Sequence, residues 1–141
     1  MVESQKSNPT ESIGKAKELI ESCCKIILSK IDDVTVDDKW NMPKLINKTI
    51  KQLNLSPENI DDTKKLSNTL KSILGSLYII ANGMAELRND YGSGHGKGPN
   101  YKGLQERHAK LAVGSAVTLV NFLWDSYELQ KETGKIKTQD T

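Results

Sequence analysis

An arginine and a histidine at the start of a glycine-rich stretch have side chains suited to phosphodiester chemistry. Arg88 ends a regular apolar pattern, and His95 follows seven residues later among glycines. A guanidinium can neutralise the charge that develops on phosphorus in the transition state. A histidine, which titrates near neutral pH, can move the proton. If the two side chains converge on one point, they could act on a phosphodiester.

The glycine-rich stretch lacks the pattern of a nucleotide-binding loop. A P-loop has two glycines separated by four residues, then Lys and Ser or Thr, directly after a strand. Here three residues separate Gly92 from Gly96, Gly98 follows Lys97, and the preceding segment has helical periodicity. The lack of a strand also excludes the dinucleotide-binding motif.

The same residues also have structural interpretations. Arg88 falls on the apolar stripe of its segment, where an unpaired charge is costly, so its guanidinium needs a partner. Helix-terminal carbonyls, a carboxylate on another helix or a bound anion could be that partner. His95 could be an exposed loop residue, and Asn89 could simply end the helix. From the residues alone, the structural interpretation of Arg88 is the more common one.

Basic and aromatic residues around this stretch could contact single-stranded RNA. Lysine and arginine would bind phosphates, and tyrosines could stack on bases. The candidates are Tyr91, Lys97, Tyr101, Lys102, Arg107 and Lys110. Lysines in a lysine-rich chain are, however, more often plain solvated residues. His108 lies on an apolar face, where a hydrogen-bonded core histidine is expected, and it is a second-rank candidate for the site.

Four helical segments would have to position these groups. Apolar residues recur at helical spacing over about 11–31, 43–53, 63–88 and 104–131, and no stretch is a convincing strand. Residues 91–103 hold five glycines and Pro99, a density of helix breakers that predicts a loop. We therefore predict an all-α bundle of four principal helices, with a long antiparallel pair joined by the glycine-rich loop.

Apolar stripes indicate how these helices pack. The first stripe runs from Ile13 to Ile31, and the third includes Ile73, Leu74 and Ile80. The fourth helix has two: Leu104, His108, Leu111, Ser115, Leu119 and Phe122 on one side, and Val113, Val117, Val120 and Trp124 on the other. The second side must meet another helix of the bundle or a second protomer, and the sequence leaves both open.

Composition and length narrow the class of protein further. With 20 Lys and Arg against 18 Asp and Glu, the net charge of +2 excludes a histone-like polycation. No stretch approaches the roughly 18 apolar residues of a membrane span. We expect a cytoplasmic protein with a disordered segment over 1–10, one helical domain over 11–131 and a flexible tail over 132–141.

The two cysteines are adjacent, which indicates buried helix residues rather than a disulfide framework. Cys23 and Cys24 both fall on the apolar stripe of the first segment. Together with His95 and His108 they lack the paired spacing of a zinc site. We expect no metal ion and no other cofactor.

The stretch from Arg88 to His95 resembles the Arg–polar–x–His motif of the HEPN superfamily. More narrowly, the chain looks like the abortive-infection C-terminal family in residues 87–97, in residues 107–113 and in the opening helix. This resemblance covers about residues 12–123. Members are all-α domains, and many HEPN proteins are metal-independent endoribonucleases of bacterial anti-phage defence or of toxin–antitoxin systems. Members of the narrower family usually carry this domain behind a larger N-terminal region, whereas this chain begins close to its first helix.

The resemblance implies a role for each motif residue. Arg88 would stabilise the phosphate, His95 would be the catalytic histidine, and Asn89 would orient them. The implied reaction is attack of the RNA 2′-hydroxyl on its own 3′-phosphate, which leaves a 2′,3′-cyclic phosphate and a free 5′-hydroxyl. The expected partners are an RNA substrate, a second copy in a homodimer, and an antitoxin or sensor protein on another chain.

Two other functions would also fit. The chain could be a non-catalytic module that binds a partner protein or nucleic acid through the same face. It could instead be a small-nucleotide sensor that uses Arg88 as a phosphate clamp. An enzyme would lose its activity in a His95→Ala variant, whereas a binding module would change little.

Overall fold

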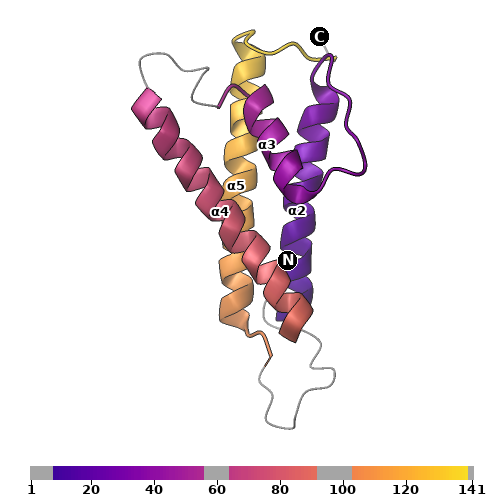
Figure 1. The fold of residues 1–141 in the computed structure, drawn as a ribbon, viewed down its shortest axis with the longest axis vertical. Helices are drawn as coiled ribbons and strands as arrows, with labels where there is room; N and C mark the ends of the chain where they lie inside the picture. Colours follow the sequence, from indigo (N-terminus) through magenta and orange to yellow (C-terminus); the bar gives the residue numbers. More distant parts are fainter. Residues whose placement is uncertain (1–7, 56–63, 92–102, 140–141) are drawn as a thin grey trace. The chain divides into compact units, whose positions relative to one another are not determined.

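The computed structural model describes residues 8–55, 64–91 and 103–139, without the side chains of 64–67 and 88–91. Its helices are α2 (Pro9–Lys30), α3 (Met42–Gln52), α4 (Lys64–Tyr91) and α5 (Glu106–Glu132), and no strand occurs among the described residues (Figure 1). The all-α class and the four helical segments predicted from the sequence are therefore confirmed.

The chain divides into two compact units that share three of the helices. Unit 1 comprises Met1–Leu19 and Ser76–Leu119, and unit 2 comprises Ile20–Gly75 and Val120–Thr141. Unit 1 thus holds the beginning of α2, the end of α4 and the beginning of α5. Unit 2 holds all of α3 with the remaining parts of the other helices. Arg88 and Asn89 belong to unit 1.

Helix α2 begins two residues before the position expected from the sequence, because Asn8 caps it. The Asn8 Oδ1 atom accepts a hydrogen bond from the Glu11 backbone N–H at 3.1 Å, and its Nδ2 donates to Glu11 Oε2 at 3.2 Å. Pro9 fits the first helical position, where no N–H is needed. Beyond this cap, the apolar stripe packs as predicted: Ile13, Ala16, Ile20, Cys23, Cys24, Ile27, Leu28 and Ile31 are buried.

The two cysteines are free thiols in this buried stripe, as predicted. Burial, reinforced by the neighbouring Cys24, raises the pKa of Cys23 to about 12. Burial also raises the pKa of Cys24, although a hydrogen bond with the Thr49 side chain on α3 opposes that change. Both thiols are therefore protonated at neutral pH, and the Cys24–Thr49 bond connects α2 to α3 within unit 2.

We expect the native protein to resist alkylation. Because the thiolate is the nucleophile, raising the pKa of Cys23 from 9.0 to about 12 lowers its reactive fraction steeply. Iodoacetamide at pH 8.5 should modify the folded protein at least about 100-fold more slowly than the same protein in urea, followed by mass spectrometry. Equal rates in the two conditions would contradict the buried placement.

The buried face of α5 differs from both stripes predicted for it. Its buried residues include Ala109, Ala112, Val113, Ser115, Ala116, Leu119, Leu123 and Tyr127. Leu111 is 48% exposed and Val117 is 36% exposed. The prediction gave most weight to large apolar side chains, whereas much of the buried stripe consists of alanines. On α4, Leu74 of the predicted stripe is buried, whereas Ile73 is 51% and Ile80 36% exposed; Ala85, which the prediction left out, is buried.

The segment after α5 differs from the frayed tail expected from the sequence. Gly134 has a φ of 74°, and the Gly134 and Lys135 N–H groups bond to the carbonyls of Lys131 and Gln130. This is a Schellman motif, which ends the helix and redirects the chain. Beyond it, the Asp32 N–H donates to the Lys137 carbonyl at 2.9 Å, and Thr138 is 2% exposed. The segment is therefore held against the end of α2.

Candidate functional site

Arg88 and Asn89 lie in the last turn of α4, which runs to Tyr91, three residues beyond the end expected from the sequence. The last carbonyls of a helix lack intrahelical partners, and the negative end of its dipole lies there. Arg88 therefore occupies a backbone position at which a positive charge is favoured. His95, Lys97, Tyr101 and Lys102 lie outside the described residues, as do the side chains of Arg88, Asn89 and Tyr91.

Arg88 continues the helical register of the buried positions of α4. Within unit 1 those positions are Ala81 and Ala85, and Arg88 follows three residues after Ala85. Positions three or four apart share one face of a helix. On the opposite side, Glu86 is exposed and accepts a hydrogen bond from the Asn82 amide at 3.2 Å. Position 88 of the backbone therefore shares a helical register with these two buried positions.

His108 caps the beginning of α5. Its Nδ1 atom accepts a hydrogen bond from the Gln105 backbone N–H at 3.0 Å, and the Gln105 carbonyl accepts from the N–H groups of His108 and Ala109. The bond to the His108 ring corresponds to one half of a capping box, with a histidine in the place of glutamate. The ring is half-buried. The structure thus gives His108 a structural role, while its Nε2 atom is not used by this bond.

Removing this cap should destabilise the protein modestly. We expect His108→Ala to lower the free energy of unfolding by about 1 kcal/mol, because the Gln105 N–H loses its acceptor. His108→Gln is the matched control, since glutamine can accept the same bond at this position. Urea denaturation of both variants measures the effect. Equal loss in the two variants would mean that the bond contributes nothing.

Arg107 and Lys110, the other candidates on α5, are exposed and already have neighbours of their own. The Arg107 Nε donates to Gln105 Oε1 at 3.0 Å. The Lys110 Nζ lies 3.2 Å from Glu106 Oε1, and the Lys110 side chain is 63% exposed. Exposed pairs of this kind contribute little to stability, so a phosphate could replace the carboxylate at small cost. Both residues lie in unit 1, as Arg88 does.

Gln105 is the residue of this region that sequence reasoning missed. It supplies the backbone N–H and carbonyl that start α5, and its side chain positions the Arg107 guanidinium. Glutamine is not a preferred residue at the N-cap. The histidine three residues later gives no standard signal either, because the usual capping box has Glu or Gln there. The sequence therefore contained no recognisable cue.

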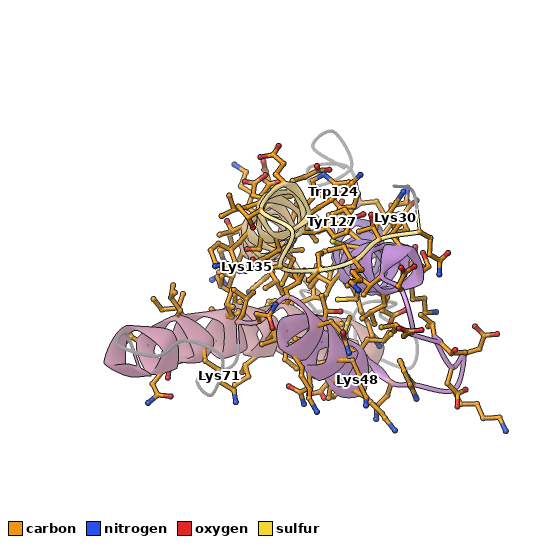
Figure 2. The ribbon with its side chains drawn as sticks, turned by 90° about the horizontal axis from the view of Figure 1, so that it is seen from above. Lys30, Lys48, Lys71, Trp124, Tyr127 and Lys135 are labelled. Carbon is orange, nitrogen blue, oxygen red and sulfur yellow. The ribbon has the colours of Figure 1, made fainter. Side chains whose placement is uncertain are left out.

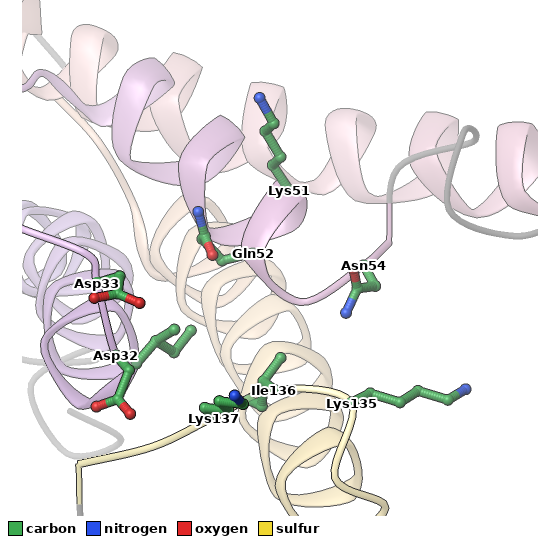
Figure 3. Close-up of a pocket in the computed structure, with 9 residues that line it drawn as sticks. Asp32, Asp33, Lys51, Gln52, Asn54, Lys135, Ile136 and Lys137 are labelled. Atoms are coloured by element: carbon green, nitrogen blue, oxygen red, sulfur yellow. The ribbon is translucent and has the colours of Figure 1, made fainter.

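Unit 2 contains a cavity of about 260 Å³ that none of the predicted site residues lines. Its lining comprises Ile31, Asp32, Asp33, Lys51, Gln52, Asn54, Lys135, Ile136 and Lys137. Figure 3 shows the Lys51 and Lys135 side chains pointing away from Asp32 and Asp33. The charged groups therefore do not converge on one point, and we assign no catalytic role to this cavity.

Among the described residues, no group of three or more His, Cys, Asp or Glu side chains is placed to hold a metal ion. No described helix combines the length and the apolar character that crossing a bilayer requires.

Comparison with protein families gives one informative result. The family Abi_C, a HEPN-like domain, matches residues 1–127. Curated proteins and solved structures give no match. The matched range includes α2, α3, α4, the glycine-rich segment and most of α5. The suspected resemblance is therefore confirmed, and the chain belongs to the Abi_C family of HEPN-like domains.

Proposed function

We propose that this protein is a metal-independent endoribonuclease, acting in anti-phage defence or in a toxin–antitoxin system. The observation that carries the proposal is the position of Arg88 in the last turn of α4, on the register of the buried face. His95 follows seven residues later in a chain of the HEPN-like Abi_C family. That order of residues supports phosphodiester cleavage.

In the proposed reaction, His95 accepts the proton of the RNA 2′-hydroxyl. The 2′-oxygen forms a bond to the adjacent phosphorus, and the bond from phosphorus to the 5′-oxygen breaks. Arg88 neutralises the charge that develops on the non-bridging oxygens, and Asn89 orients the reacting groups. The leaving 5′-oxygen takes up a proton, so the products are a 2′,3′-cyclic phosphate and a 5′-hydroxyl. Arg107 and Lys110 would contact phosphates on either side of the cut.

We further propose a homodimer, which would place two Arg88–His95 sets in one particle. Large apolar side chains are exposed on both α4 and α5 of unit 1: Ile79 is 68%, Ile80 36%, Leu111 48% and Val117 36% exposed. Burial of these side chains against a second copy would remove their apolar area from water, and this gain supports the dimer. An antitoxin or sensor protein on another chain stays a prediction.

The cleavage test uses the purified chain and a mixed RNA substrate in EDTA. We expect fragments that carry cyclic phosphate and 5′-hydroxyl ends, which radiolabelling and end-specific ligation identify. Cleavage that requires added Mg²⁺, or fragments with 5′-phosphates, would contradict the proposed chemistry. Complete absence of cleavage would favour the non-catalytic binding module.

A separate measurement tests the dimer. Light scattering at micromolar concentration should give about twice the mass of the 15.7 kDa chain. A monomeric mass at that concentration would contradict the homodimer.

A further inference from the structure

Helix α3 presents a row of lysines on the face opposite to its buried side. Its buried residues are Met42, Leu45, Ile46, Thr49 and Ile50. Lys44, Lys48 and Lys51 follow at intervals of four and three residues, so they share the outer face. Lys44 and Lys51 are exposed, and Lys48 is half-buried. The helix therefore carries one apolar face and one cationic face.

A tryptophan lies at the beginning of this row. The Lys44 Nζ is 5.5 Å and the Lys48 Nζ 5.6 Å from the centre of the Trp40 ring, which is within the range of cation–π attraction. Trp40 itself is half-exposed. The surface thus combines a partly accessible aromatic ring with two ammonium groups beside it.

The backbone that carries this surface is well fixed. The Trp40 N–H donates to the Asp37 carbonyl at 3.0 Å, and Asn41 caps α3 by accepting from the Lys44 N–H at 3.1 Å. At the other end, the Gln130 side chain donates to the Leu53 carbonyl at 3.1 Å. All of these residues belong to unit 2. The row is therefore held in place before any ligand binds.

No carboxylate among the described residues forms an ion pair with Lys44, Lys48 or Lys51; the pairs found there are Lys15–Glu11 and Lys110–Glu106. Figure 2 shows Lys71, an exposed residue of α4 in the same unit, on the same side as Lys48. This concentration of positive charge, which no described carboxylate pairs, favours a polyanionic partner.

We propose that Trp40, Lys44, Lys48 and Lys51 form a binding surface for single-stranded RNA, carried by unit 2 and additional to the candidate catalytic residues of unit 1. The lysines would contact successive phosphates, and a base would stack on the indole. A single strand offers both phosphates and flat bases, whereas an acidic peptide offers only charge. The choice of RNA rests on the proposed ribonuclease function, but binding can be measured without cleavage.

The charge of the surface is tested by RNA binding in a His95→Ala background. The probe is a fluorescein-labelled oligouridine of twelve nucleotides, measured by anisotropy at several salt concentrations. We expect Lys44→Gln with Lys48→Gln to weaken binding about tenfold, and to reduce the slope of log K against log salt by about 1.4. The matched control compares Lys25→Gln with Lys44→Gln alone: Lys25 is an exposed lysine of α2 in unit 2, and its removal should change neither quantity.

The tryptophan is tested separately by fluorescence. The chain has two tryptophans, so Trp124→Phe leaves Trp40 as the only indole. Oligouridine should quench its emission, because a stacked base lies in van der Waals contact with the excited indole. Trp40→Leu should weaken binding at least about fivefold, and Trp40→Phe should weaken it less.

The outcomes separate this surface from the ribonuclease proposal. If the double lysine variant binds oligouridine with unchanged affinity and an unchanged salt slope, the proposed RNA-binding surface is wrong, even if the parent cleaves RNA. Binding of polyglutamate as tight as that of oligouridine, without quenching of Trp40, would overturn it in favour of an acidic protein partner. Conversely, a parent that never cleaves RNA but shows both the lysine and the tryptophan effects would count against the ribonuclease and support the surface.

Discussion

His95→Ala should lower the rate of metal-independent RNA cleavage by at least about 100-fold, because general acid–base catalysis typically contributes 10²–10⁴-fold. If His95 moves the proton of the 2′-hydroxyl, an alanine leaves only water to do so. The measurement is single-turnover cleavage in EDTA with enzyme in excess, which separates chemistry from RNA binding. Circular dichroism of the variant checks that its helices are intact.

Arg88 offers a graded version of the same experiment. Arg88→Ala should cost about 100-fold to 1,000-fold in rate, as does removal of a group that stabilises transition-state charge. Arg88→Lys keeps the charge but not the planar pair of donors, so an intermediate rate is expected. Arg107→Ala is the matched control: as an exposed arginine of unit 1, it should raise KM with little change in the single-turnover rate.

Two results would refute the assignment. Full activity of His95→Ala would show that another group moves the proton, and His108, whose Nε2 atom is not used in the α5 cap, would be the next residue to test. Equal loss in Arg88→Ala and Arg88→Lys, accompanied by a lower free energy of unfolding, would indicate that Arg88 is a structural residue at the end of α4.

The sequence predicted the elements of this fold better than their packing. The stripe of α2 was predictable because large aliphatic residues such as Ile20 and Ile27 recur regularly. The face of α5 was not, because close packing there uses alanines, whose small apolar area gives a weak periodic signal. The fixed position of the segment after Gly134 depends on hydrogen bonds to residues such as Asp32, which lies about a hundred positions earlier in the chain. Local patterns contain no information about such contacts.

The candidate site was predictable in one respect. The glycine-rich stretch predicted that this helix ends near Arg88, and α4 runs to Tyr91, so Arg88 lies in its last turn. Convergence of the Arg88 and His95 side chains depends instead on the path of the connecting segment and on any second protomer, and neither is encoded in spacing. The α3 surface was missed because its lysines, considered singly, are ordinary solvated residues; only the ring of Trp40 beside them distinguishes the group.

Leu119→Ala should lower the free energy of unfolding by about 2–5 kcal/mol, since it opens a cavity where the native side chain is fully buried. Leu111→Ala is the matched control on the same helix and in the same unit, but Leu111 is 48% exposed. Leu111→Ala should lower the free energy of unfolding by less than about 1 kcal/mol, because alanine also has a higher helix propensity than leucine. The sequence had assigned both leucines to one apolar stripe, so urea denaturation of the pair discriminates between the predicted and observed faces.

Protein concentration makes this comparison informative about the dimer as well. Truncating a residue that is buried within one chain lowers the free energy of unfolding by the same amount at every protein concentration. A residue covered by a second copy contributes to that free energy only while the dimer persists. We therefore expect the Leu119→Ala loss to be independent of concentration. If the homodimer uses the apolar groups of unit 1, the Leu111→Ala loss should grow as the protein concentration rises into the range where the parent dimerises. A concentration-independent loss of several kcal/mol at Leu111 would instead restore the predicted stripe and remove the exposed apolar face that motivates the dimer.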